Sequence, residues 1–352
     1  MKKYLLPLCI LLAIVHQSCD KNDGDPIAKD DYSQILIHTT DQVIIPTYED
    51  LYAKSTVLVN TLNTLLASQT VANLEASRQA WRDARIPWEQ SEGFLYGPVE
   101  TLGLDPSIDS WPVNQADLDA VLNSGDALTK SYLDGQEGTI KGFHTLEYLL
   151  FGADSNKQAT DFTPRQFEYL VACAQSLQGA CQSLRDNWTG GQVNFGHVFK
   201  TAGQNGNAVY PSQKSALQEI VNGLITIADE VANGKINEPF SQENLTLEES
   251  RFSANSKADF ADNIRSIQNI YLGNDLSGTG VGFYNVIREK NPALDTKVRL
   301  QIEEAIDAIE SIEGTFTTAI FNAKPSVQNA RTKVRTLQET LQNEVYPVID
   351  TL

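Results

Sequence analysis

Apolar residues recur every three or four positions through most of this 352-residue chain. That spacing puts them on one face of an α-helix, whereas a half-buried strand alternates with a period of two. No long stretch alternates in that way, so the pattern predicts an all-α protein. The clearest stripes are Leu51, Ser55, Leu58, Leu62 and Leu65; Val71, Leu74, Trp81, Ala84 and Trp88; Phe167, Leu170, Ala174, Leu177, Cys181 and Leu184; and Val298, Ile302, Ala305, Ile309 and Ile312.

A glycine-rich stretch at residues 190–211 interrupts the helical pattern. It holds five glycines with polar residues between them, and helical periodicity stops there. A chain of this length is too long for one small core. We therefore expect two packed helical-bundle domains, one over residues 33–200 and one over residues 201–352, with a second glycine-rich loop at 273–282 inside the latter.

The N-terminus has the anatomy of an export signal. Lys2 and Lys3 precede an apolar stretch at residues 5–15 that is too short to span a membrane, and Ser18 and Cys19 end it. This resembles a bacterial lipoprotein cleavage site, although His16 stands where Leu is usual. We expect a signal peptide at 1–18, lipidation of Cys19 and a polar tether at 19–32. The protein would then lie in the cell envelope on the outer membrane, on its periplasmic or surface face; plain secretion is the alternative.

Acidic residues dominate the charge of the chain. Removing residues 1–18 removes two lysines and no acidic residue, which takes the formal net charge from −18 to −20. Such a surface disfavours nucleic acid and anionic lipid, and it attracts cations. Solubility alone is the simpler explanation of most of this charge.

Two cysteines, Cys173 and Cys181, remain beyond the export segment in one predicted helix. A rise of 1.5 Å per residue separates them by about 12 Å along the helix axis. A disulfide needs Cα atoms within about 7 Å of each other. We therefore predict two buried free thiols.

The candidate chemistry centres on Gly142-Phe143-His144-Thr145-Leu146-Glu147, since only His38, His144 and His197 follow the export segment. His144 and Glu147 are three residues apart, so they share one helix face. The pair can bind a metal ion, or the carboxylate can orient the ring. A purely structural pair is equally compatible with the spacing. Gly142 leaves room for another backbone or a ligand beside the helix.

A second cluster of charges lies in residues 78–98. If one helix continued through this segment, Arg82, Arg85, Glu89 and Glu92 would share a face. The simpler interpretation of such a face is a set of solvent-exposed ion pairs. We expect partial burial instead, because Glu89 and Glu92 lie among the aromatic residues Trp88, Phe94 and Tyr96.

Two further segments add candidates. Asp109 and Trp111 lie in a predicted loop and again set a carboxylate beside an indole. Later in the chain, Arg251, Ser253 and Asp259 precede or begin a predicted helix. The plainer interpretation of this segment is that Asn255 or Ser256 caps that helix.

Three ordered motifs together resemble the imelysin family, also called peptidase family M75. They are the Gly-x-His-x-x-Glu hexapeptide, the segment Trp-x-x-x-Arg-x-Pro-Trp-Glu-Gln-Ser-Glu, and the Arg-Phe-Ser…Asp-Phe segment. The similarity runs from about residue 33 to the C-terminus. It implies two packed helical bundles in an exported protein, often a lipoprotein. It also implies that the His-Glu motif lies in the first bundle, near the junction.

The resemblance and the residue chemistry give a candidate site. The candidate metal ligands are His144, Glu147, Glu89 and Glu92. The candidate ligand-binding or supporting residues are Gly142, Arg85, Trp88, Asp109, Trp111, Arg251, Ser253 and Asp259. No catalytic residue is assigned.

Three functions fit this site. Many family members resemble binding proteins tied to iron uptake, and oxygen ligands with one imidazole suit iron, so we favour a metal-binding protein whose partners are a metal ion and envelope iron-transport proteins. A metallopeptidase is the second hypothesis, although the zinc signature His-Glu-x-x-His is absent from the sequence. The third is a binder of an organic ligand such as a siderophore, glycan or peptide, held by Trp88, Trp111 and Tyr96.

Overall fold

The computed structural model describes residues 31–352, and every regular element in that range is helical, which confirms the all-α prediction. The α-helices are α1 (Ser33–His38), α2 (Ile45–Ala67), α3 (Val71–Glu89), α4 (Pro98–Thr101), α5 (Asp105–Asp109), α6 (Gln115–Leu122), α7 (Lys130–Asp134), α8 (Gly142–Phe151), α9 (Pro164–Thr189), α10 (Phe195–Lys200), α11 (Gln213–Asp229), α12 (Asn237–Gln242), α13 (Ser256–Leu272), α14 (Tyr284–Lys290), α15 (Pro292–Glu310), α16 (Phe316–Asn322), α17 (Lys324–Thr340) and α18 (Tyr346–Asp350). Three π-helical segments continue or join them, at Thr39–Ile44, Glu230–Ile236 and Leu341–Val345.

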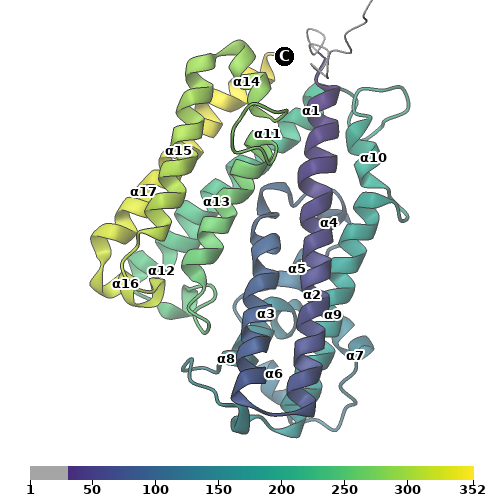
Figure 1. The fold of residues 1–352 in the computed structure, drawn as a ribbon, viewed down its shortest axis with the longest axis vertical. Coiled ribbons are helices and arrows are strands. Elements are labelled where there is room, and N and C mark those ends of the chain that lie inside the picture. The colour runs from purple at the N-terminus through teal and green to yellow at the C-terminus, as the bar shows by residue number, and fades with distance from the viewer. Residues whose placement is uncertain (1–30) are drawn as a thin grey trace, which may run out of the picture.

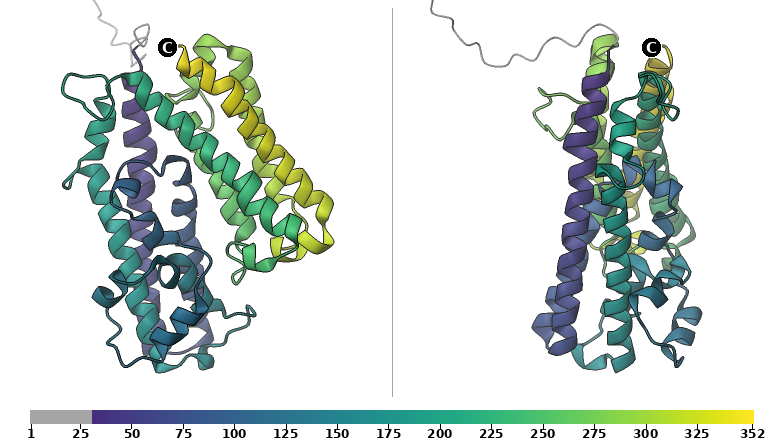
Figure 2. Two further views of the ribbon diagram at one scale, coloured as in Figure 1. Left: turned by 180° about the vertical axis from the view of Figure 1, so that it is seen from behind. Right: turned by 90° about the vertical axis from the view of Figure 1, so that its right-hand side faces the viewer.

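The helices form two groups that lie side by side (Figure 1). In the first bundle, α1–α10, the long helices α2, α3 and α9 pack together and carry the short helices α4–α8. In the second bundle, α11–α18, the long helices α11, α13, α15 and α17 pack together. The two bundles meet where α13 packs against α3. Figure 2 shows the whole fold from behind and from the side.

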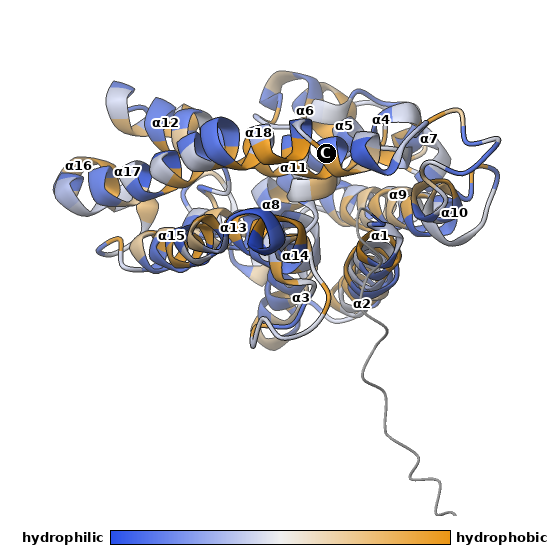
Figure 3. Cartoon of the chain, turned by 90° about the horizontal axis from the view of Figure 1, so that it is seen from above, coloured by the Kyte–Doolittle hydropathy of each residue, from blue (hydrophilic) through white to orange (hydrophobic). Residues whose placement is uncertain are grey.

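Residues of the predicted apolar stripes are buried between packed helices. Every member of the four predicted stripes is buried except Val71, which is 66% exposed because it is the first residue of α3 and precedes the packed part of that helix. Seen from above, the hydrophobic colour gathers where helices such as α9 and α11 face their neighbours (Figure 3). Proline starts α9 and α15 as predicted, after the capping residues Thr163 and Asn291.

The glycine-rich stretch at 190–211 contains a helix that the pattern did not predict. Helix α10 forms there because Phe195 and Phe199 are buried against Trp188, with ring centroids 5.0 and 6.2 Å away. A Cβ at Gly196 would lie 2.5 Å from the Trp188 carbonyl oxygen, so the glycine permits this close packing. Two aromatic residues four apart were the missed signal.

Helix α3 ends sooner than the charge pattern suggested. The prediction of one helix through Glu92 is wrong, because α3 stops at Glu89 and a short 3₁₀ turn covers Glu92–Phe94. A Cβ on Gly93 would lie 2.8 Å from Ser266 Oγ, so the turn can pack tightly against α13. The side chain of Glu92 therefore lies at the junction of the two bundles.

Several N-terminal predictions lie outside the described residues. These are the signal peptide at 1–18, the lipidation site Cys19 and nearly all of the tether at 19–32. Within residues 31–352, no helix is both long and apolar enough to cross a membrane. Cys173 and Cys181 are buried free thiols, as predicted.

Candidate metal centre

A close contact between α5 and α8 sets the position of the candidate site. Gly142 begins α8 with φ at +76°, and a Cβ there would lie 2.3 Å from the carbonyl oxygen of Ile108. Only glycine accepts both that backbone angle and that approach. The residue after Ile108 is Asp109, the last residue of α5, so the contact brings its carboxylate to His144. The space predicted at Gly142 is thus filled by backbone.

Replacing Gly142 with alanine is expected to lower the free energy of unfolding by about 2–4 kcal/mol. Backbone strain at positive φ contributes about 1–3 kcal/mol, and overpacking against Ile108 adds to it. Gly103→Ala is the matched control, since Gly103 has φ at +59° but a Cβ there would meet nothing within 4 Å. Urea denaturation should show the larger loss for Gly142→Ala. Equal losses would mean that the α5–α8 contact contributes nothing beyond the backbone angle.

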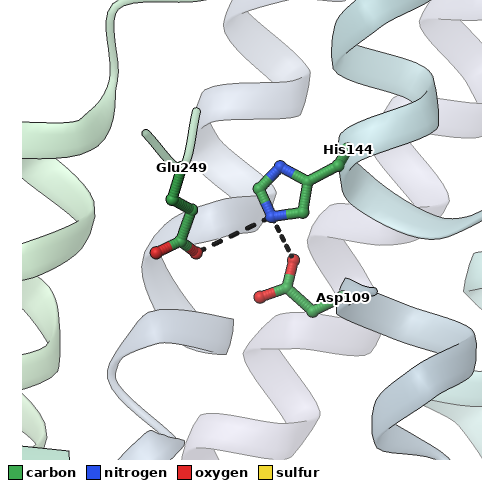
Figure 4. Close-up of side chains that lie close together, drawn as sticks. All are labelled: Asp109, His144 and Glu249. Atoms are coloured by element: carbon green, nitrogen blue, oxygen red, sulfur yellow. Dashed lines mark ion pairs between the residues drawn. The ribbon is translucent and has the colours of Figure 1, made fainter. Parts of the chain in front are cut away.

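His144 lies at the centre of the cluster and is 1% exposed (Figure 4). Its Nε2 lies 3.2 Å from Asp109 Oδ1 and 3.7 Å from Glu249 Oε1. Within residues 31–352, this nitrogen makes no well-directed hydrogen bond. Asp109, His144 and Glu249 come from α5, α8 and the turn before α13, and one ligand atom of each lies within 4.8 Å of the others.

Glu147 holds the other side of the imidazole. Its Oε2 lies 3.3 Å from His144 Nδ1. Its Oε1 accepts hydrogen bonds from the Ser253 backbone N–H at 2.8 Å and from the Ser253 hydroxyl at 2.7 Å. A carboxylate on Nδ1 fixes the ring orientation and directs Nε2 towards Asp109 and Glu249. Ser253 in turn ties this pair to the second bundle.

Arg85 is fully buried and crosses the junction between the bundles. Its guanidinium forms ion pairs with Glu89 and Asp109, lies 2.9 Å from Glu249 Oε1, and lies 3.5 Å from Asp259 Oδ2. Buried charge of this kind is tolerated only when it is paired. Arg85 therefore holds carboxylates of both bundles together.

The indole of Trp88 supports the same carboxylate cluster. Trp88 is fully buried, and its Nε1 donates a 2.6 Å hydrogen bond to Asp109 Oδ2. Tyr96 is 5% exposed. The prediction that Trp88 and Tyr96 face an organic ligand is therefore wrong, because both rings pack into the interior.

Lys235 is the second buried cation, and it comes from the π-helical segment Glu230–Ile236. Its Nζ lies 2.9 Å from Glu92 Oε2, 3.2 Å from Glu249 Oε2 and 3.7 Å from Glu89 Oε2. Asn263 of α13 donates a 2.6 Å hydrogen bond to Glu89. Six carboxyl groups thus meet two permanent cations and one histidine, so acidic groups outnumber basic ones.

The pKa shifts separate the acidic groups. Burial disfavours the charged form of each, but Arg85 and His144 hold the pKa of Asp109 well below its usual range, and Lys235 and His144 hold the pKa of Glu249 at about 2. Burial raises the pKa of Glu92 to about 8. For His144, burial opposes the positive charge, yet the Asp109 carboxylate outweighs it and keeps the pKa well above the ordinary value. Asp109 and Glu249 are therefore ionised at neutral pH.

An acidic pocket of about 340 Å³ opens beside this cluster. Five carboxylates and one lysine supply its charge: Glu92, Asp105, Asp109, Glu230, Glu249 and Lys235. Leu95, Ser110 and Trp111 complete the wall. A small cation therefore has a route to Asp109 and Glu249 through complementary charge.

The structure groups the predicted residues differently from the sequence analysis. His144 lies with Asp109, a predicted support, and with Glu249. Glu89 and Glu92 form a second group with Asp109, and Glu147 belongs to neither. Asp259 lies beside Arg85, whereas Arg251 and Trp111 line a neighbouring pocket.

Glu249 and Lys235 were not among the candidates. Lys235 had a usable signal, since it interrupts a stripe of buried apolar residues at Val231, Ala232 and Ile236. Glu249 lies in an irregular turn, where no periodicity indicates burial.

Comparisons with known proteins agree with this architecture. Iron-regulated protein A of Synechococcus elongatus is 32% identical over 322 residues, which span 90% of this chain and 86% of that protein. A crystal structure described as a "putative iron-regulated protein A precursor", from Parabacteroides distasonis ATCC 8503, superimposes with a TM-score of 0.83 at 26% identity, covering 94% of this chain and 96% of the other.

A second solved structure shares the fold at lower identity. It is an imelysin-like protein from Psychrobacter arcticum 273-4, with a TM-score of 0.73 and 14% identity, covering 90% of this chain and 95% of the other. The imelysin family model matches residues 44–345. This match spans most of the chain, so the chain belongs to the imelysin family.

Proposed function

We propose that this protein binds a metal cation, with Asp109, His144 and Glu249 as its ligands. The observation that carries the proposal is the convergence of these three groups, from three separate elements, within 4.8 Å. Two ionised carboxylates and one imidazole form a donor set that suits a borderline or hard transition-metal ion. Bound there, the cation would offset the negative charge of the two carboxylates.

The surroundings of His144 favour the same role. Metal-binding histidines usually donate their second ring N–H to a carboxylate, which sets the tautomer and the ring orientation. Glu147 occupies that position, 3.3 Å from Nδ1, and Ser253 holds Glu147 with two hydrogen bonds. Glu147 and Ser253 would then be positioning residues, and the cation would lie on the Nε2 side.

Asp109 and Glu249 are better ligands than Glu89 and Glu92. The pKa of Glu249 is about 2, whereas burial raises the pKa of Glu92 to about 8, so Glu92 retains a proton at neutral pH. Glu89 is already paired with Arg85 and Asn263. Glu89 and Glu92 would therefore act with Lys235 to define the charge around the site.

Iron is the cation we propose, in a protein of the cell envelope. The relatives in Synechococcus and Parabacteroides are named for regulation by iron, and the donor set suits that metal. A role in iron acquisition alongside envelope transport proteins fits both points. The sequence of residues 1–19 adds the proposal of a lipid anchor at Cys19.

The experiment is a calorimetric titration of metal-free protein with ferrous iron under anaerobic conditions, and with zinc and manganese. We expect one site, and we expect His144→Ala to weaken binding about tenfold or more, because it removes one of three ligands. His197→Ala is the matched control, since His197 is exposed and lies in α10. Failure of the wild type to bind any of the metals, or equal affinity in His144→Ala, would refute the proposal.

The peptidase hypothesis meets a specific obstacle at Glu147. A general base needs a carboxylate oxygen within reach of the nucleophile. Both oxygens of Glu147 already have partners, in Ser253 and His144. Metal-dependent cleavage of an unfolded protein substrate that disappears in Glu147→Ala would nevertheless contradict a role limited to binding.

A further inference from the structure

A second pocket, of about 460 Å³, lies next to the acidic one and differs from it in chemistry. Trp111 lines both pockets. The first bundle lines it with Trp111, Pro112, Val113, Asn114 and Gln115, and the second bundle lines it with Thr246, Leu247, Arg251 and Phe252. The volume is within the range of small-molecule sites, about 300–1,000 Å³. Five of these nine residues are apolar or aromatic, three are uncharged polar residues, and Arg251 is the one charged side chain among them.

Arg251 stands apart from the other arginines of the chain. Within residues 31–352, it makes no ion pair and no side-chain hydrogen bond, whereas each of the other arginines makes at least one. Its guanidinium carbon lies over the ring of Phe252, 4.5 Å from the centroid. That ring is itself held edge-on by Tyr148 at 5.2 Å. The guanidinium is thus braced on a fixed ring while its N–H donors remain available.

A chain with 45 acidic residues offers many possible ion-pair partners to an arginine. An arginine that lines a pocket without such an ion pair therefore indicates a possible binding site for an anion. A guanidinium presents N–H donors in a planar fork that matches a carboxylate. The exposed part of Trp111 and the side of Phe252 suit the flat or apolar body of the same molecule. One cation in a lining that is otherwise uncharged and mostly apolar matches a ligand with one negative charge and a mostly apolar body.

We propose that this pocket binds a small organic carboxylate, whose acid group pairs with Arg251 and whose body lies against Trp111 and Phe252. The site is separate from Asp109, His144 and Glu249, and it requires no metal. Because both bundles contribute walls, the ligand would also bridge the two halves of the protein.

The experiment compares 2-naphthoate with its neutral isostere 2-naphthamide by calorimetry on metal-free protein. A charge-assisted hydrogen bond should favour the carboxylate by about tenfold or more. Arg251→Gln should lose this preference while leaving the weaker binding of the amide unchanged. Arg251→Lys should regain part of it, since it restores the charge without the fork. Trp111→Ala should weaken both probes.

Two controls keep the outcome clear. Arg335→Gln changes an exposed arginine on α17, far along the chain, and should leave both affinities as in the wild type. His197→Ala, which changes an exposed histidine on α10, should also retain naphthoate binding. Because these titrations use metal-free protein, a failure of the metal site and a failure of this pocket are distinguishable. The proposal is overturned if the wild type does not bind naphthoate at millimolar concentration, or if Arg251→Gln keeps the preference for naphthoate over naphthamide.

Discussion

Replacing Arg85 with methionine is expected to lower the free energy of unfolding by about 3–5 kcal/mol, because a buried ion pair that loses one partner leaves uncompensated charge. Arg85 is fully buried between Glu89, Asp109, Glu249 and Asp259. Methionine keeps much of the packing volume but supplies no charge. The carboxylates of the two bundles would then repel one another at their junction.

The loss should depend on pH in a defined direction. Burial alone would raise the pKa of Asp109, but Arg85 and His144 hold it well below its usual range. The stability from a lowered carboxyl pKa is present above the unfolded value of about 3.9 and is lost as the pH falls towards the folded pKa. The loss of unfolding free energy in Arg85→Met should therefore be largest near neutral pH and become smaller at acidic pH.

Urea denaturation at several pH values measures this effect. Arg335→Met is the control, because Arg335 is 55% exposed and pairs with Glu339 across one helical turn at 3.0 Å. A pair of that kind contributes about 0.3–0.5 kcal/mol. A loss at Arg85 no larger than that at Arg335, or one independent of pH, would mean that the buried network does not hold the bundles together.

The affinity for zinc is expected to rise by up to about tenfold per pH unit as the pH increases through the neutral range. A metal ion binds neutral imidazole, so it must displace the proton that His144 carries. Burial works against that proton, but Asp109 retains it, and the pKa of His144 lies well above the ordinary value. Below that pKa, displacement of one proton gives about a tenfold change in affinity per pH unit.

Calorimetry in buffers with different ionisation enthalpies counts the protons released. We expect close to one proton per metal ion at neutral pH, and the same number in His197→Ala. Binding without proton release, with an affinity that does not change over this pH range, would show that His144 Nε2 is not a ligand.

The helices could be predicted from the sequence because their signal is local. The stripe at Leu58, Leu62 and Leu65 reflects a period that the backbone imposes on any amphipathic helix. Errors arose where packing overrides that period. Helix α3 ends at Glu89 because the following turn packs against α13, and α10 forms because Phe195 and Phe199 find buried partners 5–6 Å away.

Only part of the candidate site could be predicted from the sequence. His144 and Glu147 face each other because three residues separate them on one helix, and that relation is local. Glu249 and Lys235 approach from a different bundle, 105 and 91 residues further along the chain than His144. No spacing rule links such positions, so their contribution depends on how the bundles pack. Asp109 could be predicted in part. It comes from another helix, but Gly142, which allows the close approach of that helix, lies within the predicted motif.

We propose that Asp109, His144 and Glu249 together hold a metal cation while Glu147 orients the imidazole. An anomalous difference map from crystals of the zinc- or iron-loaded protein tests it most directly. We expect one strong peak among His144 Nε2, Asp109 and Glu249, with Glu147 still next to Nδ1. A peak among Glu89, Glu92 and Asp109, or no peak at the junction of the bundles, would contradict it.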